Sequence, residues 1–311
     1  MTRTAVLIPC YNEEAAVAKV VADFRKTLPD ADIYVYDNNS RDRTIEVAKQ
    51  AGAIVRSEPL QGKGNVVRRM FADVEADIYV MVDGDATYDA ASAPKMIEAL
   101  RRDSLDMVNG VRVTDIEKAY RPGHRFGNWL LTSMVSWIFG SRFSDMLSGY
   151  RVMSRRYVKS FPALSAGFET ETELTVHALE LRMPILEIAT PYKDRPEGSI
   201  SKLSTFKDGF RILWTIIVLV KEERPMQFFS LLALFFVIIS TALIVPIFIG
   251  YMETGLVPRL PTAVLSMGLM IVAFLCLTCG LILDTVTRGR REMKRMRYLN
   301  IPAPQTTDSA A

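Results

Sequence analysis

The chain has few of the residues that build disulfide scaffolds or histidine-rich metal sites. Its 311 residues include three cysteines and two histidines. Cys10, Cys276 and Cys279 are too few for a disulfide framework, and two of them lie in an apolar run, so we expect reduced, structural thiols. So few histidines argue against a histidine-rich zinc site. The sequence also lacks internal repeats and low-complexity segments, and its 49% apolar and 23% charged residues exclude a disordered protein.

A strongly basic surface is absent from most of the chain. The net charge is +3, but residues 285–311 carry six positive and two negative side chains, so the rest of the chain is net negative. This distribution argues against nucleic acid as a partner, because a nucleic-acid-binding domain needs a basic face. We expect the basic C-terminal tail either to lie on anionic lipid headgroups or to be a solvated charge run.

Two long runs without charge are present near the C-terminus. Met226–Ile249 has 24 residues and Thr262–Leu283 has 22, and about 20 apolar residues span a bilayer. The alternative, a pair of buried core helices, fits these lengths poorly. The short link Gly250–Pro261 predicts a transmembrane hairpin. Basic residues flank the outer ends of both runs, so the positive-inside rule predicts cytoplasmic termini and a cytoplasmic N-terminal domain, in a protein of the cytoplasmic (inner) membrane.

Residues 201–224, directly before the hairpin, have an amphipathic pattern. Phe206, Phe210 and Trp214 recur at helical spacing, while Lys207 falls elsewhere on the helix. We interpret this segment as an amphipathic helix in the membrane interface. An ordinary helix packed on the soluble core is the alternative.

Residues 1–200 alternate strand and helix patterns, which predicts βαβ units, an α/β fold and a mainly parallel sheet. The expected strands are Ala5–Pro9, Asp32–Tyr36, Ala53–Arg56, Ile78–Val82 and Met107–Val111. The expected helices run from Glu14 to Leu28, from about Asp42, from about Val66 and from Ser92 to Arg102. Ligands of such sheets bind at the carboxyl ends of the strands. Polar clusters lie at three of these ends, Tyr11–Glu13, Asp37-Asn38 and Asp83–Asp85, so we expect one site there.

Asp83-Gly84-Asp85 is the sharpest of these clusters. Two carboxylates one residue apart at a strand end can hold a hard divalent cation and leave coordination sites for phosphate oxygens. Taken alone, the motif is equally consistent with a turn. Asp37 is a candidate acceptor for a base or ribose, with helix capping as the alternative. Lys63, between two glycines, is either a phosphate contact or part of a turn, since the P-loop pattern is absent.

Further candidates follow the fifth expected strand. A basic cluster suited to phosphate comprises Arg112, Arg121, His124 and Arg125. It precedes an aromatic stretch from Trp129 to Phe143, for which lipid contact and core packing are both open. Acidic residues follow at Asp145, Glu169, Glu171 and Glu173. A loop before the amphipathic segment is either a phosphate clamp or a polar linker, and it contains Arg195, Gly198, Ser201 and Lys202.

Taken together, these motifs resemble those of family 2 glycosyltransferases. VLIPCYNEE, YDNNSRDRT, DGD, FSDMLSGYR, GFETETEL and RPEGSISK occur in the family's order over about residues 4–215. The chain is most similar to the polyprenyl-phosphate sugar transferases, such as dolichyl-phosphate mannose synthase and undecaprenyl-phosphate glucosyltransferases. The resemblance implies a GT-A fold, a Mg²⁺ or Mn²⁺ cofactor, a UDP- or GDP-linked sugar donor and a polyprenyl-phosphate acceptor. It leaves the oligomeric state open, a homo-oligomer included.

Positions that match the family's motifs give the expected site. Donor binding is implied for Pro9, Tyr11, Glu13, Asp37, Lys63, Asp83, Gly84, Arg195 and Lys202. The metal motif is matched by Asp83 and Asp85. Binding of the acceptor phosphate is implied for Arg112, Arg125, Ser148 and Arg151. The expected catalytic residues are Asp145, Asp85 and Arg125. Two departures from the family's pattern are Gly84, where alanine is more common, and Thr87, where glutamine is frequent.

The resemblance implies an inverting transfer to a phosphate oxygen. A phosphate monoester is mostly dianionic at neutral pH, so it needs no strong base to attack the anomeric carbon. Positioning and charge neutralisation should then carry most of the rate. We therefore expect Asp145 to orient the acceptor or an arginine.

Three other functions compete with this one. A processive polysaccharide synthase is disfavoured, because the Gln-x-x-Arg-Trp motif and further spans are missing. A transferase with a glycolipid or glycan acceptor would need a base more strongly and the arginine cluster less. A non-catalytic nucleotide-binding membrane adaptor is disfavoured by the retention of both aspartates, Arg195 and Lys202.

Overall fold

A computed structural model describes residues 2–113, 143–164, 169–195 and 217–303, with Ser133, Val135, Trp137, Gly167 and Trp214. Contacts divide the chain into one unit, Met1–Ile212 with Lys294–Ala311, and a second unit, Leu213–Met293. The elements are β1 (Thr4–Cys10), α1 (Val17–Thr27), β2 (Asp32–Asp37), α2 (Thr44–Gln50), β3 (Ile54–Ser57), α3 (Lys63–Asp73), β4 (Ile78–Met81), η1 (Ala90–Ser92), α4 (Ala93–Arg102), β5 (Met107–Val113), β6 (Arg151–Ser154), α6 (Arg155–Ser160), α7 (Thr170–Glu180), β7 (Ile185–Pro191), α9 (Pro225–Thr254) and α10 (Leu260–Leu299).

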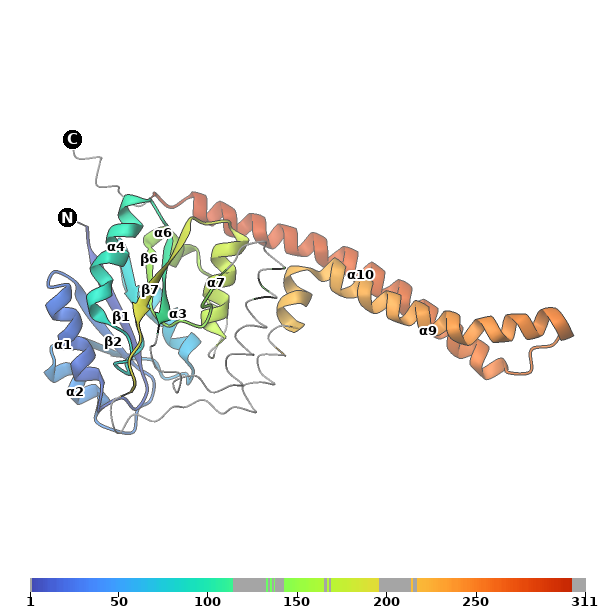
Figure 1. Cartoon of the computed structure of the whole chain (residues 1–311), viewed down its shortest axis with the longest axis horizontal. Helices are drawn as coiled ribbons and strands as arrows, with labels where there is room; N and C mark the ends of the chain where they lie inside the picture. Colours follow the sequence, from blue (N-terminus) through green and yellow to red (C-terminus); the bar gives the residue numbers. More distant parts are fainter. Residues whose placement is uncertain are drawn as a thin grey trace. The chain divides into compact units, whose positions relative to one another are not determined.

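The first unit is built on a seven-stranded sheet in the order β3-β2-β1-β4-β6-β5-β7. Strand β6 is antiparallel to both of its neighbours, and the other pairs are parallel. Helices α1, α2 and α4 cover one face, and α3, α6 and α7 cover the other (Figure 1). Because both faces are covered, β4 is apolar along its whole length, and all four of its residues are buried. The expected α/β architecture with a mainly parallel sheet is confirmed.

The expected helices and strands of residues 1–113 are present, with shifted ends. Helix α1 begins at Val17 rather than Glu14, because the carbonyl of Glu13 accepts hydrogen bonds from the amides of Ala16 and Val17 and makes a turn there. Helix α3 begins at Lys63, three residues before the expected start. Strands β6 and β7 were not expected. Strand β6 has four residues and begins with an arginine, so its sequence does not show the alternation of apolar and polar residues that predicts a strand.

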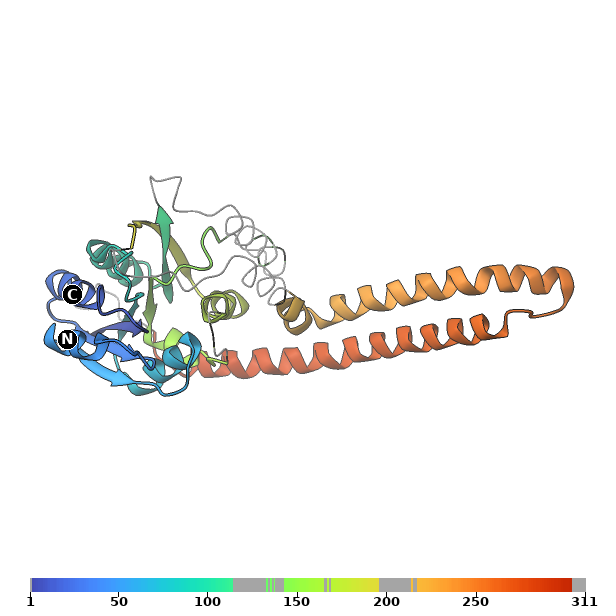
Figure 2. The ribbon, with the colours of Figure 1, turned by 90° about the horizontal axis from the view of Figure 1, so that it is seen from below.

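Helices α9 and α10 of the second unit lie side by side and antiparallel (Figure 2). Both are long and apolar enough to be candidate membrane spans, and only 17% of the most apolar window of each is buried, which is unlike a core helix. Their seam is lined by small side chains, and Ser240 and Ser266 each donate a hydroxyl hydrogen bond to the other's carbonyl, at 2.8 and 2.9 Å. Such pairing suits helices packed in an apolar solvent.

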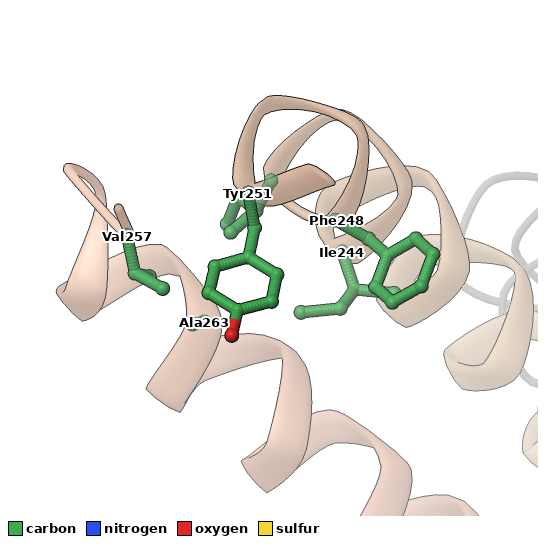
Figure 3. A pocket seen from close by; sticks show the side chains of 6 residues that line it. Ile244, Phe248, Tyr251, Val257 and Ala263 are labelled. Carbon is green, nitrogen blue, oxygen red and sulfur yellow. The ribbon is translucent and has the colours of Figure 1, made fainter. Parts of the chain in front are cut away.

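The tip of the hairpin holds a hollow of about 220 Å³ (Figure 3). Its six lining residues carry no charge: Ile244, Ile247, Phe248, Tyr251, Val257 and Ala263. This lining offers no group for nucleotide or phosphate chemistry.

Most of residues 201–216 lie outside the described part of the chain. Trp214 and residues 217–223 are helical, and α9 begins at Pro225 after a break at Arg224. The amphipathic helix predicted for residues 201–224 therefore stays a prediction.

The C-terminal end of α10 belongs to the first unit. Lys294 Nζ lies 2.6 Å from Glu180 Oε2 on α7. The hydroxyl of Tyr298 donates to Asp106 Oδ2 at 2.7 Å, and the Arg156 guanidinium lies 4.8 Å from the centre of the Tyr298 ring. The last turns of α10 are thereby attached to α7 and to the start of β5.

Other cations of the basic tail are also paired within the chain. Arg288 pairs with Asp284, and Arg290 and Arg291 both pair with Glu223, which is 5% exposed. The described part of the tail is thus a helix in which several cations have acidic partners. Whether the tail lies on anionic headgroups or is solvated stays a prediction.

Candidate functional site

The three polar clusters of the sequence meet at one edge of the sheet. Strands β2, β1 and β4 are adjacent and parallel, so their carboxyl ends lie side by side. Cys10, the last residue of β1, is paired with Asp37, the last residue of β2. Asp83 and Asp85 follow β4 at the same edge. The topology therefore brings the candidate donor and metal residues together, as parallel strands require.

Lys63 joins the first aspartate of the Asp-Gly-Asp motif to α7. Its ammonium lies 2.5 Å from Asp83 Oδ1 and 2.5 Å from Glu171 Oε1. The side chains of Lys63 and Glu171 are 11% and 7% exposed. Burial lowers the pKa of Lys63, but the two carboxylates outweigh it and raise the pKa above the ordinary 10.5. The lysine is therefore a fixed positive charge.

The second aspartate is held by two further side chains. Arg195 pairs with Asp85 Oδ2 at 2.7 Å, and the Thr87 hydroxyl donates to Asp85 Oδ1 at 2.6 Å. The amide of Thr87 also donates to that oxygen, at 3.2 Å. Thr87, one of the two departures from the family's pattern, thus orients the carboxylate that follows β4.

Two glycines allow the close packing around the aspartates. A Cβ on Gly149 would lie 2.6 Å from the carboxyl carbon of Asp83, and a Cβ on Gly84 would lie 2.5 Å from Cys10 Sγ. Real Cβ atoms do not approach so closely, so a side chain at Gly149 would displace the carboxylate. Gly149 was not predicted as a site residue.

The end of β2 presents an unpaired acceptor. Asp37 is 2% exposed, and its Oδ1 is buried without a hydrogen-bond partner among the described residues, while Oδ2 accepts from the amide of Ser40 at 3.1 Å. The neighbouring Asn38 donates to the carbonyl of Leu60 at 2.8 Å and accepts from the amide of Gly62 at 2.7 Å. Asn38 therefore fixes the loop that leads into Lys63, a role that the sequence did not reveal.

Pro9, Tyr11 and Glu13 lie at the end of β1 and directly after it. Pro9 and Tyr11 are partly exposed, and Glu13 is 7% exposed. The amide of Glu13 donates to Thr44 Oγ1 at 2.8 Å, which ties this loop to the start of α2. All three predicted donor residues thus border the same strand-end edge as Asp37.

Arg112 and Asp145 form a forked ion pair. Arg112 Nε lies 2.7 Å from Asp145 Oδ2, and its Nη2 lies 2.8 Å from Oδ1. Asp145 is 4% exposed, and the guanidinium also lies 5.6 Å from the centre of the Tyr192 ring. A carboxylate used in this way fixes the plane and direction of the arginine.

The expectation that Ser148 and Arg151 bind the acceptor phosphate does not agree with their positions in the structure. Both are 0% exposed. The Ser148 hydroxyl donates to the carbonyl of Gly110 at 2.5 Å. The Arg151 guanidinium donates to the carbonyls of Met146 and Glu171, at 2.7 and 3.0 Å. Both side chains are thus committed to backbone partners, and Arg151 anchors the first turn of α7.

Several predicted residues lie outside the described part of the chain. They are Arg121, His124, Arg125, Gly198, Ser201 and Lys202. Their expected roles stay predictions, as does the role of most of the stretch from Trp129 to Phe143.

The residues at the strand ends supply only some of the ligands that a hard divalent cation needs. Asp83 and Asp85 supply carboxylate oxygens, which such cations prefer. Among the described residues, no group of three or more His, Cys, Asp or Glu side chains is arranged around a metal position. The donor set therefore fits an ion that takes its remaining ligands from phosphate oxygens and water.

Comparison with known proteins agrees with this geometry. Residues 5–160 match the family model described as Glycosyl transferase family 2. Glycosyltransferase AglJ of Haloferax volcanii is 32% identical over 302 residues, which cover 94% of this chain and 97% of the relative. The dolichyl-phosphate hexose transferase of the same organism is 28% identical over 220 residues, which cover 71% of this chain and 95% of the relative.

A solved structure supports the fold. Glucosyl-3-phosphoglycerate synthase from Mycobacterium tuberculosis, in complex with Mn²⁺, UDP and glucosyl-3-phosphoglycerate, superposes with a TM-score of 0.58. The match has 22% identity and covers 71% of this chain and 79% of that one. The predicted GT-A fold is confirmed. The chain belongs to glycosyl transferase family 2 and is a glycosyltransferase similar to the polyprenyl-phosphate sugar transferases.

Proposed function

We propose that this glycosyltransferase transfers a sugar from a UDP- or GDP-linked donor to a polyprenyl phosphate, with inversion at the anomeric carbon. The observation that carries the proposal is the strand-end edge where Asp83 and Asp85 are each paired with a cation. A relative named as a dolichyl-phosphate hexose transferase matches 71% of this chain, and the two candidate spans suit a lipid acceptor.

The donor would lie across the ends of β1, β2 and β4. The unpaired Oδ1 of Asp37 is a ready acceptor for an N–H of the base. Lys63 and Arg195 are the described cations nearest the aspartates, and they suit the donor's diphosphate. Pro9, Tyr11, Glu13 and Gly84 complete this pocket in the proposal, with Lys202 from the following loop.

Asp83 and Asp85 would hold Mg²⁺ or Mn²⁺. Such an ion supplies neutralisation of the charge that develops on the leaving diphosphate. The structural neighbour solved with both Mn²⁺ and UDP supports the assignment. The part of Thr87 is to keep the Asp85 carboxylate oriented.

Arg112, together with Arg125, would bind the acceptor phosphate. Both carboxylate oxygens of Asp145 accept hydrogen bonds from Arg112, so neither is well placed to accept a proton from the acceptor phosphate. A phosphate monoester is largely dianionic at neutral pH and attacks without a strong base. Asp145 is therefore proposed as a positioning residue for Arg112.

The first unit, Met1–Ile212 with Lys294–Ala311, carries the proposed site and is called the catalytic unit below. It would work at the cytoplasmic face of the cytoplasmic membrane. The basic flanks of the two candidate spans support this orientation through the positive-inside rule. An acceptor that is presented by the membrane also explains why a glycosyltransferase carries the hairpin.

The proposal is tested by a transfer assay on the purified full chain. The assay combines undecaprenyl phosphate, Mg²⁺ or Mn²⁺ and a panel of radiolabelled UDP- and GDP-sugars. We expect a labelled, organic-extractable lipid, at least about a hundredfold less with Asp85→Asn, since removal of an electrostatic stabiliser costs that much in other enzymes. Lys95→Gln, at an exposed position of α4, is the matched surface control.

Two results would overturn the proposal. Near-normal transfer by Asp85→Asn would refute the metal assignment. Binding of a nucleotide-sugar without lipid product from any donor would favour a glycolipid or glycan acceptor, or the non-catalytic adaptor.

A further inference from the structure

The sequence places three glutamates at alternate positions before and within α7, and only one of them is paired with Lys63. Glu171 Oε1 lies 2.5 Å from Lys63 Nζ, while Glu173 Oε1 accepts from the amide of Leu164 at 2.8 Å. Glu171 is 7% exposed in its side chain, and within the described part of the chain its buried Oε2 has no hydrogen-bond partner. A buried carboxylate with one cation and one unpaired oxygen is costly unless it has a function.

The position of Glu171 is itself fixed from behind. The buried Arg151 guanidinium donates to the carbonyl of Glu171 at 3.0 Å and to that of Met146 at 2.7 Å. The hydroxyl of Thr175, one turn along α7, donates to the same Glu171 carbonyl at 3.2 Å. The start of α7 is thus anchored to β6, so Glu171 approaches Lys63 from a rigid element.

The charges show why Lys63 needs a second partner. In the structure, Lys63 neutralises Asp83, the carboxylate that would also face a divalent ion. When a divalent cation neutralises Asp83 instead, that carboxylate attracts Lys63 less and the ion repels it. Glu171 is then the one described carboxylate that still pairs with the ammonium, at a distance where a phosphate oxygen can share it.

We propose that Glu171 is a positioning residue for donor binding, which retains Lys63 beside Asp83 and presents its ammonium to the donor's diphosphate. The inference rests on the proposed function. Glu171 touches neither the sugar nor the reacting atoms in this assignment, and it acts through Lys63. Its effect should therefore depend on the presence of a second phosphate in the ligand.

The experiment measures binding to the purified full chain by isothermal titration calorimetry with Mn²⁺ present. The ligands are UDP and UMP, or GDP and GMP where guanine is the base that the wild type binds. The variants are Glu171→Gln, Lys63→Ala and the double variant, and Glu173→Gln is the matched control on the same helix. Thermal unfolding of each variant is recorded alongside.

We expect Glu171→Gln to weaken the binding of the diphosphate by about tenfold, which is the effect of losing one charge-assisted contact. The monophosphate should be affected less than about twofold. In the Lys63→Ala background, Glu171→Gln should cause no further loss, because both residues act through the same ammonium. Glu173→Gln should bind both ligands as the wild type does.

The inference is overturned if Glu171→Gln binds the diphosphate as tightly as the wild type. It is also overturned if both ligands weaken equally, or if the losses of the two single variants simply add. If Glu171→Gln does not fold, Glu171→Asp replaces it. The binding of both ligands is then measured for Glu171→Asp alone and for Glu171→Asp combined with Lys63→Ala. Lipid-linked product from the wild type together with these results would reject the inference and leave the proposed function standing.

Discussion

His177 shows how burial changes the chemistry of one side chain. It is 2% exposed, its Nε2 lies 3.1 Å from Ser160 Oγ, and its ring packs edge-on against Tyr157 and Phe161. Burial, with a smaller contribution from the charge of Lys294, lowers the pKa of His177 from 6.5 to about 3. The imidazole is therefore neutral in the folded protein over most of the acidic range.

This lowered pKa predicts an acid sensitivity. Between pH 6.5 and about 3 the unfolded chain binds a proton at His177 and the folded chain does not. The free energy of unfolding should therefore fall with falling pH, by about 1.4 kcal/mol per pH unit from this residue. His177→Phe should flatten the dependence of the unfolding midpoint on pH in this window. An equally steep dependence in the variant would contradict the assignment.

At the scale of elements, the end of α10 is attached to the catalytic unit by buried charges. Lys294 pairs with Glu180, whose side chain is 0% exposed, and Tyr298 donates to Asp106, which is also 0% exposed. A buried carboxylate that loses its cation is left uncompensated, which is more costly than the pair itself is favourable. The end of α10 should therefore matter to the stability of α7 and β5.

Lys294→Met should destabilise the catalytic unit by about 3 kcal/mol, because the buried Glu180 carboxylate loses the ammonium that lies 2.6 Å from it. Adding Glu180→Gln should recover much of the loss, since the uncompensated charge is then gone. The measurement is the unfolding midpoint of the purified protein, with the exposed Arg297→Ala as control. An unchanged midpoint in Lys294→Met would show that the pair contributes nothing.

At the scale of the whole molecule, the hairpin determines how the chain meets the membrane. Thr254 ends α9 beside the link between the two candidate spans, and Ala303 follows α10. Both are exposed. The positive-inside rule predicts that the link lies on the outer side and the C-terminus in the cytoplasm.

Cysteine labelling of intact cells tests this orientation. In a chain with Cys276→Ser and Cys279→Ser, an impermeant maleimide should label Thr254→Cys in intact cells and Ala303→Cys only after the cells are opened. The reverse pattern would place the catalytic unit outside and contradict a cytoplasmic donor. Labelling of both positions only after the cells are opened would show that the hairpin does not span the bilayer as proposed.

Local sequence patterns were enough to predict the α/β class, the carboxyl-end location of the site and the two candidate spans. These features depend on contiguous patterns, namely apolar strands that stop at polar residues and uncharged runs of span length. The aspartates at Asp83 and Asp85 were visible for the same reason. Each signal lies within a few residues, and parallel pairing then brings the strand ends together.

Contacts between side chains that are distant in the sequence became visible only in the folded chain. Glu171 contacts Lys63 across 108 positions of the sequence. In the sequence alone, the nearby glutamates Glu169 and Glu173 cannot be told apart from it. Arg151 looked like a phosphate ligand but is buried against backbone carbonyls, and Lys294 of the basic tail is paired with Glu180 of α7. Burial and pairing depend on how elements pack, and that information is not local in the sequence.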